Sequence, residues 1–280
     1  MMTRGREWIA FLALVAACGK PSQVVLEDKG SDTMVNLMQR LSESYRAVDP
    51  SVVIAVTGGG SGTGIKSLID GTTHMANASR QMKDEEKAAA ETNGVHPHET
   101  VVAYDGLAIY VHKDNPIESI SFDDLRCIYD SAGTCKTWAD VGVTLDCGDI
   151  VKLSRQNNSG TYEYFREEVL GKDGKFTTTM DQSGTQQVVD LIGTTKCAIG
   201  YGGMGYHSDA VRFVCLSRAE GGPCSVPSVE SVKAGTYPFS RPLFVYTNGA
   251  PEGATAKYLE WVTGPAGQAI ALEAGFVPLK

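Results

Sequence analysis

The chain has 280 residues, of which 42% are hydrophobic and 21% charged, a composition typical of a globular protein large enough for two lobes. Its 25 lysines and arginines against 33 aspartates and glutamates give a formal net charge of -8. This acidic balance, without a basic stripe, argues against a nucleic-acid partner.

Residues 1–17 have the pattern of an export signal. Two arginines precede an apolar run over residues 8–17, which is too short to span a bilayer core of about 30 Å. The ending VAAC resembles a bacterial lipobox, so we expect cleavage before Cys18 and a lipid on its thiol. A plain secretory signal, with Cys18 as a free residue, is the alternative. In both cases the mature chain is exported. In the first case, residues 18–23 form a polar tether that carries the lipid.

The first hundred residues alternate strand and helix signals, which predicts an α/β lobe with a mainly parallel sheet. The segment VVLEDKGSDTMVNLMQRLSESYRAVDP predicts a strand, a turn and a helix whose apolar positions run from Met34 to Tyr45. A buried strand in SVVIAVTGGG leads through the glycine-rich loop into a second helix, and a short strand in HMANASRQM precedes a charged helix over 83–91.

A second unit begins after the β-rich segment ETVVAYDGLAIYVHKDNP. The predicted elements are a helix over 122–129, a strand over 149–154, a helix capped by Ser159 that buries Tyr162, Phe165 and Val169, a helix over 186–192, a strand at CAIGYGG, a strand at RPLFVYTNG and a last helix over 254–262.

Six cysteines follow Cys18, and export places them in an oxidising compartment, where an even number suggests up to three disulfides. They are Cys127, Cys135, Cys147, Cys197, Cys215 and Cys224. The short loops favour the pairs Cys127–Cys135 and Cys215–Cys224, and the other pairing stays open. Zinc is the rival, but there is no C-x2-C pair, so we expect no metal site.

Three segments place hydroxyls and small residues at the entrance of a predicted helix: residues 30–33, 60–63 and 159–161. Each offers free backbone N–H donors and the positive end of a helix dipole. Ser and Thr are also ordinary helix caps, which would explain one such segment. Three of them, all after predicted strands, indicate a ligand, because the crevice of an open α/β sheet lies outside the carboxyl ends of its strands. The loop TGGGSGTG matches no nucleotide-binding or nucleophile motif, so we expect a small oxyanion.

The chain resembles the substrate-binding proteins of bacterial high-affinity phosphate ABC importers. The motifs that carry this resemblance are GSDTMVNLMQRLSESY, TGGGSGTGIKSLIDG, ANASRQMKDEE, AYDGLAIYVHKDNP, RQNNSGTYEYFREEVLG and AIGYGG. The resemblance implies the α/β two-lobe periplasmic-binding-protein fold of type II, with lobes joined by two crossing strands over 101–111 and 241–246. Lobe 1 would comprise residues 24–104 plus 247–280, and lobe 2 residues 105–246.

By motif matching, the resemblance also implies a set of phosphate ligands. They are Ser31, Asp32, Thr33, Ser61, Arg80, Arg155, Ser159, Gly160 and Thr161. Arginine can direct two N–H groups at two phosphate oxygens, and hydroxyls add neutral donors. Arg80 and Arg155 could instead form salt bridges on the surface or between the lobes.

One acceptor is also expected, because phosphate near neutral pH carries a proton that sulfate lacks, and a carboxylate accepts that proton and repels sulfate. Some family members have an aspartate where this chain has Arg80. Asp105 is therefore our first candidate and Asp32 the second. Asp105 could instead be a hinge residue that caps backbone N–H groups.

We accordingly expect a monomeric lipoprotein, anchored to a bacterial membrane in the cell envelope and facing the periplasm. It would bind inorganic phosphate and deliver it to a membrane-embedded ABC permease, without a cofactor and without catalysis. An enzyme is disfavoured because Ser159 has no recognisable base and the five histidines form no cluster. The alternatives are a binding protein for sulfate, molybdate or an organic phosphate, and a lipoprotein of this fold that acts as an adhesin or signalling partner.

Overall fold

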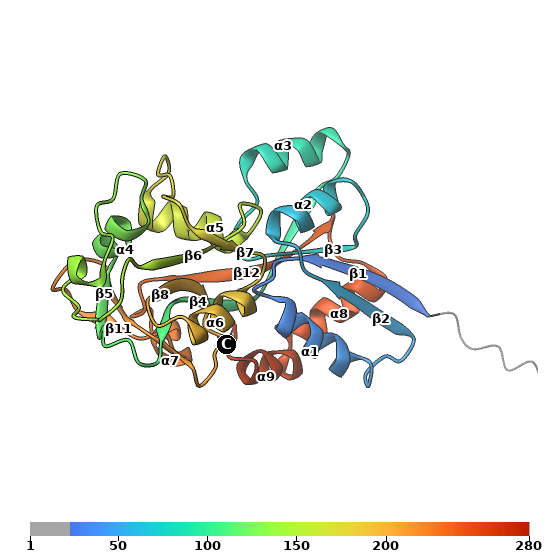
Figure 1. The fold of residues 1–280 in the computed structure, drawn as a ribbon. Helices are drawn as coiled ribbons and strands as arrows, with labels where there is room; N and C mark the ends of the chain where they lie inside the picture. Colours follow the sequence, from blue (N-terminus) through green and yellow to red (C-terminus); the bar gives the residue numbers. More distant parts are fainter. Residues whose placement is uncertain (1–22, 280) are drawn as a thin grey trace, which may run out of the picture.

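The computed structural model describes residues 23–279, which form a nine-stranded sheet, a three-stranded sheet and the helices that cover them (Figure 1). The predicted signal peptide, the lipidation at Cys18 and most of the tether lie outside these residues. The strand order of the large sheet is β2-β1-β3-β12-β4-β8-β6-β7, with β9 paired to β4. Its strands are β1 Val24–Gly30, β2 Val52–Thr57, β3 Met75–Ala78, β4 Pro97–His112, β6 Val151–Arg155, β7 Met180–Gln182, β8 Ala198–Gly203, β9 Val211–Phe213 and β12 Ser240–Asn248.

The first lobe is built on β1, which pairs in parallel with β2 and β3. Its helices are α1 Val35–Tyr45, α2 Ser61–Ile69, α3 Asp84–Thr92, α8 Gly253–Thr263 and α9 Pro265–Glu273. Helix α1 buries Leu37, Met38, Leu41 and Tyr45, at the spacing of one helix face. These side chains share a core with Tyr258 of α8, so the C-terminal helices complete the N-terminal lobe.

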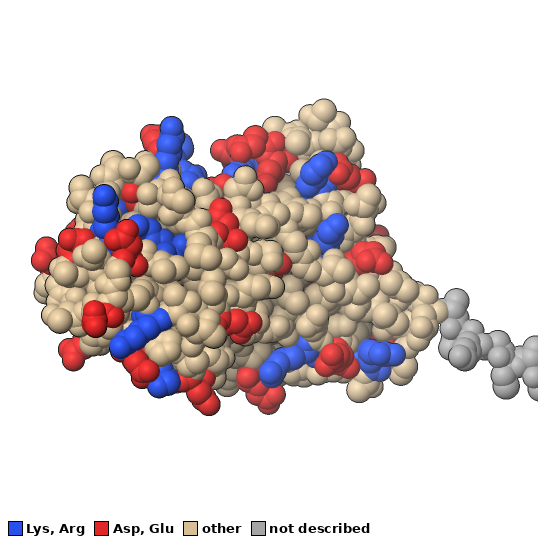
Figure 2. Space-filling view, in the orientation of Figure 1, with Lys and Arg blue, Asp and Glu red and all other residues tan. Residues whose placement is uncertain are grey.

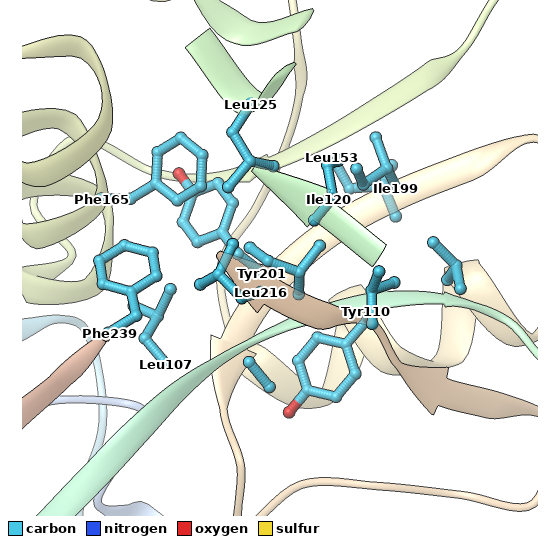
Figure 3. Close-up of a cluster of buried hydrophobic side chains, with 14 of the residues drawn as sticks. Leu107, Tyr110, Ile120, Leu125, Leu153, Phe165, Ile199, Tyr201, Leu216 and Phe239 are labelled. Carbon is cyan, nitrogen blue, oxygen red and sulfur yellow. The ribbon is translucent and has the colours of Figure 1, made fainter. Parts of the chain in front are cut away.

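The second lobe contains the rest of the large sheet and the small sheet. Its helices are α4 Phe122–Tyr129, α5 Gly160–Phe165, α6 Thr185–Thr194 and α7 Val229–Lys233, with a 3-10 turn Trp138–Val141 and a π turn Arg166–Leu170. The small sheet consists of β5 Ser119–Ser121, β10 Cys215–Ser217 and β11 Cys224–Ser225. Figure 3 shows part of the hydrophobic core of the second lobe. In this core the rings of Phe165 and Tyr201 stack with centroids 3.9 Å apart.

Two antiparallel strands, β4 and β12, run through both lobes. β12 pairs with β4 from Pro97 to Gly106, and β4 then pairs with β8 from Leu107 to Val111. The core divides at the same place, because Ala103 packs in the first lobe and Leu107 in the second. The predicted crossing segments lie within these strands. We propose the first lobe boundary near residue 104, as predicted, and the second near residue 240 instead of 246, because Leu243 and Val245 already pack in the first lobe.

Three disulfides lie in the second lobe: Cys127–Cys135, Cys147–Cys197 and Cys215–Cys224. The two pairs predicted from their short loops are confirmed. The third joins cysteines 50 residues apart, which no local pattern could indicate.

The structure differs from the sequence predictions at several elements. The first-lobe strands β1, β2 and β3 are parallel as predicted, but the large sheet as a whole is mixed, because β12 runs antiparallel to β3 and β4. Helix α9 was not predicted, since it buries only the small residues Gly267 and Ala271 and so gives little apolar signal. Tyr162 is half-buried, because Phe165 is the side chain through which α5 enters the core.

Charges are mixed on the face shown in Figure 2, where acidic and basic side chains alternate over both lobes. Within residues 23–279, no helix combines the length and apolar character that a membrane span requires.

Candidate functional site

Buried polar residues lie where the strands of both lobes end. Ser31 and Thr33 follow β1, Ser61 follows β2 and begins α2, and Ser79 follows β3. In the second lobe, Arg155 ends β6. Because the crevice of an α/β sheet lies outside the carboxyl ends of its strands, the fold brings these residues, all of them predicted except Ser79, to one place between the lobes.

Three serines and a glycine form one side of this site. The Ser31 hydroxyl donates to Ser79 Oγ over 2.9 Å, and Ser61 Oγ accepts the backbone N–H of Ser79 over 3.1 Å. Gly160, the first residue of α5, lies against both partners. A Cβ at this position would clash with Ser61 Oγ and lie 2.8 Å from Ser79 Oγ. Only glycine therefore allows the second lobe to approach the serines this closely.

Two threonines meet across the lobes. Thr33 Oγ1 and Thr161 Oγ1 are 2.8 Å apart, although 128 residues separate them in the sequence. Ser159 caps α5, since its hydroxyl oxygen accepts the backbone N–H groups of Thr161 and Tyr162. A capping hydroxyl that accepts in this way keeps its own proton to donate to a ligand.

Asp32 and Arg155 form an ion pair between the lobes, with 2.9 Å between Asp32 Oδ2 and Arg155 Nη2. The same Nη2 donates to the Ser183 carbonyl, and Nη1 donates to Thr185 Oγ1. Asp32 Oδ1 accepts the backbone N–H of Gly59. Burial lowers the pKa of Arg155 from its ordinary value, and the nearby Asp32 carboxylate opposes that shift. The protein itself thus uses most donors of this guanidinium.

Asp105 and Arg241 form a second pair, at the crossing of β4 and β12. Asp105 Oδ2 accepts from Arg241 Nε at 3.2 Å and from Nη2 at 3.0 Å, while Oδ1 accepts the backbone N–H of Met204. Both side chains are buried. Burial raises the pKa of Asp105, and Arg241 opposes that shift.

Arg80 lies beside α2 but pairs within its own lobe. Its Nη1 and Nη2 donate to the two carboxylate oxygens of Glu86 over 2.8 and 2.7 Å, and Nη1 also donates to the Gln81 carbonyl. Arg80 thus forms a salt bridge within the first lobe, whereas the alternative expected from the sequence was a salt bridge on the surface or between the lobes.

Further contacts hold the lobes closed on one another. The Asn158 side chain donates to the Gly59 carbonyl and to Thr63 Oγ1, and the backbone carbonyl of Asn158 accepts the N–H of Gly62. Gly60 permits this fit, because its φ is +90° and a Cβ there would lie 2.6 Å from the Asn158 carbonyl oxygen. Lys83 of the first lobe also pairs with Glu163 of the second over 3.0 Å.

Sequence reasoning missed three residues of this site: Ser79, Asn158 and Arg241. Ser79 had a usable signal, since it directly follows the short strand in ANASR. Arg241 also had one, as a cation inside an otherwise apolar predicted strand. Asn158 had none, because its partners depend on how the lobes meet.

The arrangement is suited to an oxyanion. Hydroxyls from both lobes and two oriented arginines offer neutral and charged donors, while two carboxylates can accept a proton. Among residues 23–279, no group of three or more His, Cys, Asp or Glu side chains is placed to hold a metal ion.

Comparison with known families places the chain among binding proteins. A family model described as the PBP superfamily domain matches residues 21–266. The phosphate-binding protein PstS of Pseudomonas aeruginosa is 36% identical over 267 residues, which cover 91% of this chain and 83% of that protein. PstS of Staphylococcus epidermidis is 31% identical, with 92% of this chain and 80% of that protein covered.

Solved structures share the fold. A phosphate ABC transporter substrate-binding protein with bound phosphate, from Clostridium perfringens, superposes with a TM-score of 0.80 at 27% identity, covering 91% of this chain and 100% of that one. An ABC-type phosphate transport receptor from Vibrio cholerae superposes with a TM-score of 0.70 at 23% identity, covering 90% of this chain and 99% of that one, and shows the fold alone.

Proposed function

Since the chain belongs to the PstS family of phosphate-binding proteins, we propose that it binds inorganic phosphate with high affinity between its lobes and delivers it to an ABC phosphate permease. The observation that carries this proposal is the meeting of Thr33 and Thr161 in a buried site, at 2.8 Å and from opposite lobes. A phosphate at this place would receive donors from both lobes at once. Its binding would therefore favour the closed arrangement.

The proposed ligands are the residues that the motifs predict and the fold gathers: Ser31, Thr33, Ser61, Arg155, Ser159, Gly160 and Thr161. Their contacts support this assignment, because the hydroxyls face one another and Arg155 is oriented by four neighbours. Arg80 stays a candidate at the rim, where its contacts with Glu86 compete with a ligand.

We propose Asp105 as the acceptor of the phosphate proton, with Asp32 as the alternative. Asp105 is buried at the crossing strands, and its Oδ1 accepts only the Met204 N–H among the described residues. Asp32 is the alternative because it lies between the lobes, where its two oxygens accept hydrogen bonds from Gly59 and Arg155.

The protein would act as an exported, monomeric lipoprotein that is anchored through Cys18 to a bacterial membrane and faces the periplasm. It would perform no catalysis and need no cofactor. This part of the proposal rests on the export signal in the sequence and on the family, whose members named above are binding proteins.

A thermal unfolding experiment tests the proposal. A ligand that binds only the folded state at 1,000 times its Kd raises the free energy of unfolding by about 4 kcal/mol. We therefore expect millimolar phosphate to raise the Tm by roughly ten degrees and the same concentration of sulfate to leave it unchanged. An equal rise in sulfate would favour another oxyanion as the ligand. No rise in either anion would argue against an anion-binding role.

A further inference from the structure

We infer that Arg241 is a second cationic ligand for phosphate in this site; the inference rests on the proposed function and extends it to the crossing strands. Arg241 lies on β12 directly opposite Asp105 of β4. Its side chain is 1% exposed and that of Asp105 is 0% exposed. The pair is thus enclosed at the junction of the lobes.

The guanidinium of Arg241 contacts a hydroxyl from each lobe. Its Nη2 donates to Thr161 Oγ1 over 2.9 Å and lies 3.5 Å from Thr33 Oγ1. These are the two threonines that meet across the lobes. A phosphate that takes hydrogen bonds from both hydroxyls would therefore lie beside this guanidinium.

Arg241 also retains donors that the protein does not use. Its Nη1 is buried and has no hydrogen-bond partner among the described residues. Buried N–H groups are nearly always paired, so two unpaired hydrogens on a buried cation indicate an acceptor that belongs to a ligand. Arg155 differs, because its Nε, Nη1 and Nη2 all donate to protein atoms.

The surroundings of Arg241 fix the guanidinium in place. Asp105 accepts hydrogen bonds from Nε and Nη2, so Nη1 is the guanidinium nitrogen that does not donate to Asp105. The Tyr164 ring lies 5.4 Å from the guanidinium carbon, and its hydroxyl donates to the Ser240 carbonyl. Asp105 also balances the buried charge, without which the cation would be costly to enclose. An arginine held in this way loses little conformational freedom when an anion binds.

Calorimetric titration of two variants tests the inference without leaving a buried carboxylate unpaired. Asp105→Asn keeps Arg241, while the double variant Asp105→Asn with Arg241→Gln removes both charges. Loss of two charge-assisted hydrogen bonds predicts that the double variant binds phosphate roughly 100-fold more weakly than Asp105→Asn alone. Equal affinities would overturn the inference, because a purely structural arginine would not distinguish the two. Arg218→Gln is the control, since Arg218 is an exposed arginine that also lies over an aromatic ring, Phe122.

A crystal structure of the unaltered protein with phosphate provides a second measurement that does not depend on any variant folding. We expect a phosphate oxygen within hydrogen-bond distance of Arg241 Nη1. Phosphate bound between the lobes but out of reach of Nη1 would overturn the inference and leave the proposed function intact. Absence of phosphate binding by the unaltered protein would overturn both.

Discussion

Arg155 is oriented more completely than any other predicted ligand. Four hydrogen bonds join its guanidinium to Asp32, Gln182, Ser183 and Thr185. Since Asp32 belongs to the first lobe and the other three to the second, this side chain both presents positive charge and links the lobes. Its removal should affect ligand affinity more than the loss of one exposed ion pair would.

We expect Arg155→Ala to weaken phosphate binding by at least about 100-fold, because hydrogen bonds from a charged group are each worth about 1.5–3 kcal/mol. Calorimetry would measure the affinity. Arg126→Ala is the control, since Arg126 pairs with Asp123 on the surface of the same lobe. Retained affinity in Arg155→Ala would remove Arg155 from the ligand set.

We expect Asp105→Asn to reduce discrimination against sulfate. An amide can donate to an oxygen that carries no proton, whereas a carboxylate repels it. The ratio of phosphate to sulfate affinity, measured by competition, should therefore fall. An unchanged ratio would transfer the acceptor role to Asp32, and the matching variant Asp32→Asn would then be the one to show the loss.

Asp28 is a buried carboxyl outside the site. It lies on β1, and neither of its oxygens has a hydrogen-bond partner among the described residues. Burial raises its pKa from 3.8 to about 7, with Asn77 opposing the shift. The folded protein therefore binds this proton more tightly than the unfolded chain does, so stability is greatest at low pH and falls as pH rises from about 4 through 7.

We expect the free energy of unfolding to fall by about 1.4 kcal/mol per pH unit between pH 5 and pH 7 and to level off above pH 7. Asp28→Asn should remove this dependence and be the more stable protein at pH 8. Urea unfolding followed by circular dichroism would measure both proteins. A parallel decline in wild type and variant would show that other groups cause the pH dependence.

The loop that precedes α5 forms hydrogen bonds between the two lobes. Asn158 makes three hydrogen bonds to the glycine-rich loop that leads into α2, two from its side chain and one to its carbonyl. These bonds join elements of different lobes, so they can form only on closure. They should slow ligand release without affecting the first encounter.

Asn158→Ala should accordingly speed phosphate dissociation roughly tenfold, since it removes two neutral hydrogen bonds of about 0.5–1.5 kcal/mol each. Association should change little. Stopped-flow measurements would separate the two rates. Asn93→Ala is the control, because Asn93 makes its side-chain hydrogen bond at the end of α3, within one lobe. Equal dissociation rates in the two variants would show that the Asn158 hydrogen bonds do not slow phosphate release.

Elements with strong periodicity could be predicted from the sequence. The helix expected over 122–129 coincides with α4, and the strand and helix at residues 24–45 correspond to β1 and α1. Helix α9 was missed because Gly267 and Ala271, its buried residues, are too small to mark a face. The short strands β9 to β11 were missed because each has at most three residues.

For the molecule as a whole, the sequence predicted which residues gather but not how they pair. The strand-end motifs placed Ser31, Ser61 and Arg155 in one site, because parallel strands end at a common edge. The pairs Arg155–Asp32, Arg241–Asp105 and Lys83–Glu163 join residues 80 or more positions apart. The pair Arg241–Asp105 depends on the register of β4 and β12, and the other two depend on the relative placement of the lobes; no local pattern records either.

The central claim is that one phosphate binds between the lobes and sulfate does not. Isothermal titration calorimetry of residues 19–280, stripped of bound anion, tests it most directly. We predict tight binding of one phosphate per chain and no heat with sulfate. Binding of sulfate with comparable affinity, or no heat with either anion, would contradict the claim.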